Sequence, residues 1–174
     1  MDLEARLKRI IRDVPDFPKK GIVFKDITPL LGDAAAFDAT IEALAEPHAR
    51  SGLKLIAAVE SRGFIFGAAL ACRLKAGFIP IRKPGKLPSA TVRESYSLEY
   101  GTDTLEMHAD AIARGSRVLI VDDLLATGGT AGAAAALVRK QGGEVVAASF
   151  VIELEFLKGR ERLAGLPIFS LVKF

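Results

Sequence analysis

The chain has 174 residues, of which 50% are hydrophobic and 26% are charged, and its formal net charge at pH 7 is +3. This length indicates one domain, 1–174, and the hydrophobic fraction excludes general disorder. The apolar stretches are too short to span a membrane and residues 1–20 have no apolar signal-peptide core, so we expect a cytoplasmic protein without a membrane partner. The basic residues are scattered rather than clustered, which argues against nucleic acid as a partner.

The first 50 residues are expected to contain two helices. Leucine and isoleucine at helical spacing predict an amphipathic helix over residues 2–12, which Pro15 and Pro18 prevent from continuing. A short extended run, Ile22–Phe24, follows. Asp33 can cap the next helix, which we expect to run to about Arg50.

Apolar runs alternate with helical segments through the rest of the chain, which predicts an α/β fold with a parallel sheet. The expected strands are Leu55–Val59, Phe78–Ile81, Arg117–Asp122, Val145–Ile152 and Ile168–Val172. The expected helices are Phe64–Lys75 and Ala131–Lys140. Between Arg82 and Met107 the sequence is polar and rich in proline and glycine, so we expect a mobile hairpin outside the sheet.

Cys72 and the two histidines carry no recognisable chemistry in the sequence. Cys72 lies in an apolar helical stretch and is expected to be a small core residue. His48 and His108 are far apart, lack cysteine partners and are expected at the surface, so their spacing predicts no zinc site.

The segment 118–130 carries the clearest functional signal. Four apolar residues without alternation predict a strand buried on both faces, and Asp122 and Asp123 follow it directly. A loop of small and hydroxyl-bearing residues then leads into a helix: Ala126, Thr127, Gly128, Gly129 and Thr130. Backbone N–H groups at a helix N-terminus favour a phosphate, whereas adjacent carboxylates accept hydrogen bonds from a sugar diol. A turn that uses these residues only for capping is the simpler alternative, but the two carboxylates and two threonines favour a ribose-phosphate site.

The segment Glu60-Ser61-Arg62-Gly63 occupies the equivalent place after an earlier strand. Ligands of open parallel sheets gather at the carboxyl ends of the strands. An arginine followed by glycine at such a turn offers a guanidinium fork and free N–H groups, which suit a pyrophosphate. Alone this pattern is weak and usually marks only a surface arginine in a turn; beside segment 118–130 it indicates the second half of a site.

Segment 118–130 resembles the 5-phosphoribosyl pyrophosphate (PRPP) motif of the type I phosphoribosyltransferases. Further motifs occur in the order found in one family of that group, the adenine phosphoribosyltransferases: Asp16-Phe17-Pro18, Phe24-Lys25-Asp26, Glu60–Phe64, Arg82–Pro88, Tyr96–Gly101 and Glu153–Arg160. The resemblance implies a parallel central sheet flanked by helices, a small N-terminal hood (about 1–32) and a flexible loop (about 83–108). It also implies a cis peptide between Glu60 and Ser61.

The resemblance further implies a function in purine salvage: transfer of the 5-phosphoribosyl group from PRPP to N9 of adenine, giving AMP and pyrophosphate. Mg²⁺ would be carried by PRPP and pyrophosphate, with no protein ligand of its own, and the enzyme would be a homodimer. The catalytic residues would be Glu99, Arg62 and Tyr100, with Glu99 as the general base. PRPP and AMP would be held by Asp122, Asp123 and the loop Ala126–Thr130. Pyrophosphate would be held by Glu60, Ser61, Arg62, Arg82 and Lys86. Adenine would be held by Val23, Phe24, Lys25, Leu124 and Leu154.

Three other readings remain open. The first is a phosphoribosyltransferase for another purine base, and the second is a regulatory module that binds PRPP without turnover. The third is a βαβ scaffold with a glycine-rich turn, which would make every motif coincidental. The loop containing Glu99 favours catalysis on adenine over these alternatives.

Overall fold

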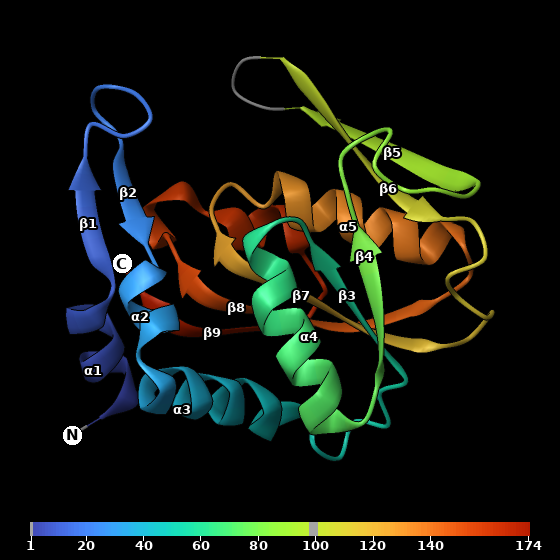
Figure 1. The fold of residues 1–174 in the computed structure, drawn as a ribbon. Helices are drawn as coiled ribbons and strands as arrows, with labels where there is room; N and C mark the ends of the chain where they lie inside the picture. Colours follow the sequence, from blue (N-terminus) through green and yellow to red (C-terminus); the bar gives the residue numbers. More distant parts are fainter. Residues whose placement is uncertain (1, 98–100) are drawn as a thin grey trace.

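A central five-stranded sheet organises the chain, in a computed structural model that describes residues 2–97 and 101–174 (Figure 1). Its order is β4-β3-β7-β8-β9, and all neighbouring strands are parallel. The bounds are β3 Leu55–Val59, β4 Gly77–Ile81, β7 Arg117–Leu125, β8 Glu144–Glu153 and β9 Ile168–Lys173. The expected parallel α/β sheet is confirmed, although β7 extends beyond its expected end at Asp122.

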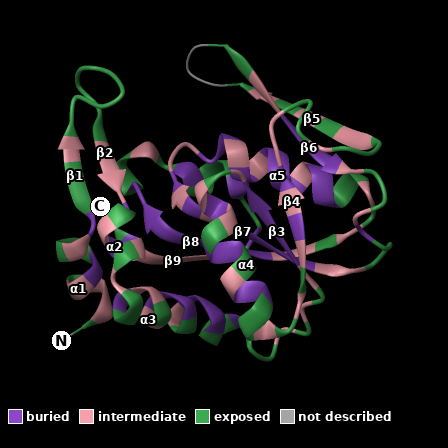
Figure 2. Cartoon of the chain, in the orientation of Figure 1, coloured by how far each residue is buried: buried purple, intermediate pink, exposed green. Residues whose placement is uncertain are grey.

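The helices cover the two faces of the sheet. Helices α3 (Ala34–Ala45) and α4 (Arg62–Leu74) lie on one face, and α5 (Gly129–Lys140) lies on the other. Side chains of β3 alternate accordingly. Ile56 and Ala58 belong to the core on the α3/α4 face, whereas Ala57 and Val59 belong to the core on the α5 face. Figure 2 shows buried residues concentrated in the central strands and the inward sides of the helices.

The hood is more structured than expected. Helix α1 (Leu3–Ile10) ends before the antiparallel pair β1 (Arg12–Pro15) and β2 (Val23–Asp26), and α2 (Thr28–Gly32) follows. The sequence predicted neither β1 nor α2. The next helix, α3, ends at Ala45 rather than near Arg50, and a 3₁₀ turn, Glu46–His48, replaces its last turn. Pro47 accounts for the change, because it has no backbone N–H to continue the helical hydrogen bonds and its ring clashes with the carbonyl four residues before it.

The excursion outside the sheet is an antiparallel hairpin of β5 (Thr91–Ser97) and β6 (Thr102–His108). It packs against α5 rather than projecting freely, and the Lys140 ammonium donates a 2.9 Å hydrogen bond to the Arg93 carbonyl. Two further 3₁₀ turns, Glu155–Leu157 and Gly159–Leu163, connect β8 to β9.

Two expectations about burial are wrong. Cys72 is exposed, because its position on α4 faces away from the sheet. His48 is buried, and its Nε2 lies 2.7 Å from the Ser149 hydroxyl of β8. A single apolar stretch or a lone histidine does not reveal which side of a helix meets the core. None of the helices in the described parts of the chain is both long enough and apolar enough to cross a membrane.

Candidate active site

The two adjacent carboxylates lie inside the last part of β7, since that strand ends only at Leu125. The Asp123 N–H donates a 2.9 Å hydrogen bond to Oδ1 of Asp122, and Asp123 is 5% exposed. Burial and the neighbouring Asp123 carboxylate raise the pKa of Asp122 well above its usual value. Burial also raises the pKa of Asp123, although the Arg62 guanidinium opposes that shift. The pair therefore has a strong need for cations or hydrogen-bond donors.

Helix α4 approaches this pair through Gly63. A Cβ atom at Gly63 would lie 2.7 Å from Oδ1 of Asp122 and 3.2 Å from the Val121 carbonyl oxygen. Only glycine permits this approach without displacing the carboxylate or the strand. The glycine after Arg62 thus brings the start of α4 against the end of β7.

The loop after β7 forms an open helix N-terminus. Helix α5 begins at Gly129, and the preceding Gly128 has a φ of +81°, a conformation that favours glycine. A side chain at Gly128 would also collide with the backbone of Gly159. The first-turn N–H groups of a helix have no partners within it, and together with the helix dipole they attract an anion.

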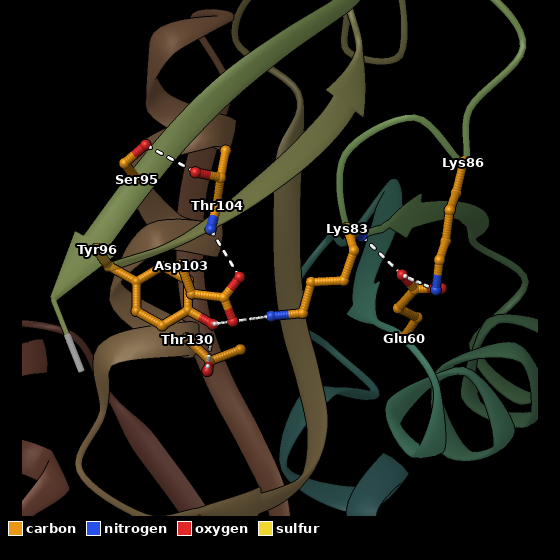
Figure 3. Close-up of polar contacts among 8 residues, drawn as sticks. All are labelled: Glu60, Lys83, Lys86, Ser95, Tyr96, Asp103, Thr104 and Thr130. Carbon is orange, nitrogen blue, oxygen red and sulfur yellow. Dashed lines mark hydrogen bonds and ion pairs between the residues drawn. The ribbon is translucent and has the colours of Figure 1, made fainter. Parts of the chain in front are cut away.

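The peptide bond between Glu60 and Ser61 is cis, as the resemblance implied. The buried Glu60 carboxylate accepts hydrogen bonds from Arg82 Nε at 2.9 Å and from the Lys83 backbone N–H at 2.7 Å. It also forms a 3.0 Å ion pair with Lys86 (Figure 3). Burial alone would raise the pKa of Glu60, but these donors together lower it. Glu60 therefore holds the segment from Arg82 to Lys86 at the rim of the site.

Arg62 connects the carboxylate pair to the hood. Its Nη2 lies 2.9 Å from Oδ2 of Asp123, and its Nη1 donates a 3.3 Å hydrogen bond to the Lys25 carbonyl. The guanidinium carbon lies 4.7 Å from the centre of the Phe24 ring, within range of a cation–π interaction. One side chain thus contacts the residues expected to bind ribose and base.

A cavity of about 300 Å³ brings these segments together. Its lining residues are Val59, Glu60, Ser61, Arg62, Lys83, Tyr96, Asp122, Asp123 and Thr130. The sequence did not single out Val59, Lys83 or Tyr96 as site residues. Lys83 and Tyr96 stand inside two of the motifs that carry the family resemblance, so that signal was available.

The other expected site residues lie around this cavity. Lys25 directs its ammonium to Asp13 at 2.7 Å and over the Phe174 ring, which leaves its backbone beside Arg62. Val23 is half exposed, Leu124 is half-buried and Leu154 is buried in the core of the α3/α4 face. Glu99 and Tyr100 fall outside the described residues. Within the described ranges, no group of three or more His, Cys, Asp or Glu side chains could hold a metal ion.

Comparison with known proteins gives consistent matches over the whole chain. Residues 32–162 match the family model described as phosphoribosyl transferase domain. The adenine phosphoribosyltransferase of Thermobifida fusca (strain YX) is 58% identical over 170 residues, which are 98% of this chain and 97% of that protein.

Solved structures agree with these sequence matches. The crystal structure of adenine phosphoribosyltransferase from Thermoanaerobacter pseudethanolicus is 59% identical, with a TM-score of 0.94 over 98% of this chain and 99% of that one. The Saccharomyces cerevisiae enzyme, solved with an imino-altritol bisphosphate and adenine, is 41% identical with a TM-score of 0.91 over 97% and 98% of the two chains.

Proposed function

This chain belongs to the adenine phosphoribosyltransferase family, and we propose that the cavity between β3, β7 and α5 is where it transfers the 5-phosphoribosyl group of PRPP to N9 of adenine. The products are AMP and pyrophosphate, and the reaction is a step of purine salvage. The observation that carries the assignment of the site is the meeting of Asp122, Asp123, Arg62 and Thr130 around one cavity.

The sugar-phosphate part of PRPP would occupy the end of β7 and the start of α5. Asp122 and Asp123 would accept hydrogen bonds from the ribose hydroxyls. These bonds would offset the free-energy cost of burying two adjacent carboxylates. The 5′-phosphate would bind the N–H groups of the loop Ala126–Thr130, where the positive end of the α5 dipole lies.

The pyrophosphate would bind on the side of the cis peptide, at Ser61 and the three cations Arg62, Arg82 and Lys86. A carboxylate would repel a pyrophosphate, so Glu60 would act by holding Arg82 and Lys86 at the rim. When the bond from C1′ to pyrophosphate lengthens, negative charge grows on the leaving group, and these cations would stabilise it. Arg62 would exchange its contact with Phe24 for the diphosphate and thereby uncover the ring.

Adenine would stack on Phe24, while the backbone groups of Val23 and Lys25 would read its edge. Leu124 and Leu154 would close the apolar side of the base pocket. The base must lose a proton as N9 attacks C1′, and Glu99 would accept it through N7, assisted by the neighbouring Tyr100. A positioned general base of this kind is worth ~10²–10⁴-fold in rate.

Mg²⁺ fits this site as an ion that enters with PRPP on its diphosphate oxygens. Magnesium keeps several waters and is normally held by one or two carboxylates together with substrate phosphates, rather than by a complete protein cage. Asp122 and Asp123 line this cavity and would accept hydrogen bonds from waters of the ion. When bound, the ion would neutralise charge on the leaving pyrophosphate. We further propose, from the family resemblance, that the enzyme works as a homodimer in the cytoplasm.

A spectrophotometric assay of AMP formation from adenine, PRPP and Mg²⁺ tests the proposed function. We expect turnover with adenine, little with hypoxanthine or guanine, and none after chelation with EDTA. Turnover that prefers an oxopurine would instead identify a phosphoribosyltransferase for another base. PRPP binding without any turnover would identify a binding module.

A further inference from the structure

A continuous set of hydrogen bonds joins the hairpin to the start of α5 (Figure 3). The Thr130 hydroxyl donates to the Tyr96 hydroxyl at 3.2 Å, and Tyr96 donates to Oδ2 of Asp103 at 3.2 Å. The same oxygen forms a close ion pair with the Lys83 ammonium. Tyr96 and Asp103 are paired across the hairpin, so their side chains lie on the same face of it.

The ring of Tyr96 also packs directly on the glycine that begins α5. A Cβ atom at Gly129 would lie 3.0 Å from Cδ2 of Tyr96, tighter than ordinary van der Waals contact. The hairpin therefore contacts the first two residues of the helix, with its aromatic ring against Gly129 and its hydroxyl on Thr130. This packing gives a reason for glycine at position 129 that is independent of any ligand.

Lys83 connects this arrangement to the cis-peptide side of the cavity. Its backbone N–H donates to the Glu60 carboxylate at 2.7 Å, while its side chain crosses to Asp103. Burial alone would lower the pKa of Lys83, but its hydrogen bond to Asp103 and the neighbouring Tyr96 raise it. Lys83 thus remains charged, and its ion pair with Asp103 persists at neutral pH.

We propose that Lys83, Tyr96 and Asp103 are positioning residues that form a latch, which holds the β5–β6 hairpin against the phosphate-binding end of α5. The latch deepens the proposed function and rests on it for its catalytic consequence. Tyr96 and Asp103 lie on either side of Glu99 in the sequence and are paired with each other, so the latch holds both strands at the end of the hairpin that leads to residues 98–100. The latch would also hold the Thr130 hydroxyl beside the site for the 5′-phosphate.

Tyr96→Phe is the sharpest test, because it removes only the hydroxyl and keeps the ring on Gly129. The hairpin offers a matched control: the Ser95 and Thr104 hydroxyls lie 2.9 Å apart and exposed, away from the latch (Figure 3). Ser95→Ala therefore also removes one cross-hairpin hydrogen bond. We expect hydrogen exchange of the β5 and β6 amides, measured without substrates, to be about tenfold faster in Tyr96→Phe than in Ser95→Ala. Equal exchange in the two variants would overturn the latch.

Kinetics provide a second, independent test. We expect Tyr96→Phe to lower kcat/KM for PRPP about tenfold with little change in the thermal midpoint, whereas Ser95→Ala should leave it unchanged. Lys83→Met and Tyr96→Phe should be non-additive when combined, because both break one hydrogen-bonded set. Additive effects, or a fall in thermal stability that accounts for the kinetic loss, would refute the latch.

The two tests separate the latch from the proposed function. A wild-type enzyme that makes no AMP from adenine and PRPP would refute the proposed function, and the hydrogen-exchange comparison would still decide the latch. An active enzyme with equal exchange and equal kcat/KM in both variants would refute the latch alone.

Discussion

Gly63→Ala should disturb the carboxylate pair without replacing any proposed ligand-binding side chain. The new Cβ would lie 2.7 Å from Oδ1 of Asp122 and 3.2 Å from the Val121 carbonyl oxygen. The carbonyl belongs to β7, which is paired with β3 and β8 and cannot retreat, so the Asp122 side chain must rotate or α4 must shift. Overpacking of this kind costs about 1–3 kcal/mol.

Gly132→Ala is the matched control, because a Cβ there meets nothing within 4 Å. Both variants gain the helix propensity of alanine, so the difference between them isolates the clash. At roughly 2–4 °C per kcal/mol for a chain of this size, Gly63→Ala should melt about 2–12 °C below Gly132→Ala in differential scanning calorimetry. Its KM for PRPP should also rise about tenfold, which is ~1.4 kcal/mol of lost ribose contact. Equal melting temperatures, or an unchanged KM for PRPP in Gly63→Ala, would refute this account of the approach of α4.

Three further outcomes follow from the charges in and around the site. Burial and Asp123 raise the pKa of Asp122. The stability linked to its protonated form is therefore complete below about pH 3.9 and is lost as the pH rises through the raised pKa. Asp122→Asn should melt above wild type at pH 7, converge with it in acid, and bind PRPP more weakly in calorimetric titration. Glu99→Gln should lower kcat by ~10²–10⁴-fold at an unchanged thermal midpoint, and undiminished turnover would remove Glu99 from the mechanism. Burial lowers the pKa of His48. The stabilising contribution of its neutral form is therefore complete above about pH 6.5 and is lost as the pH falls through the lowered pKa. His48→Gln should flatten the fall in melting temperature between about pH 7 and pH 5, and an equally steep fall would exclude His48 as its source.

Local pattern predicted the sheet well because a strand buried on both faces has a distinct signature. Val118–Val121 lacks any polar alternation, and all four side chains are fully buried. The same pattern placed the end of β7 too early, because two adjacent aspartates look like the start of a turn. In the structure β7 continues, since β8 pairs with it as far as Leu125 opposite Glu153.

The missed parts of the site depend on contacts between segments distant in sequence. Lys83 and Asp103 lie 20 residues apart and meet where the segment after β4 passes beside β6, and no periodicity along the chain reports that contact. His48 was wrongly expected at the surface because its burial depends on Ser149, a hundred and one residues away. Motif spacing could identify the segments that meet, but not which side chains meet within them.

The strand order also determines how late the site can form during synthesis. Leu55 of β3 pairs with Val118 of β7, which lies 118 − 55 = 63 residues further along the chain. At about 5–20 residues per second on the ribosome, β3 would wait roughly 3–13 s for this partner, with one apolar edge unpaired. The nascent chain thus exposes an aggregation-prone edge of β3 until β7 pairs with it. Because β7 also carries Asp122 and Asp123, the carboxylate pair of the site takes its place only at that step.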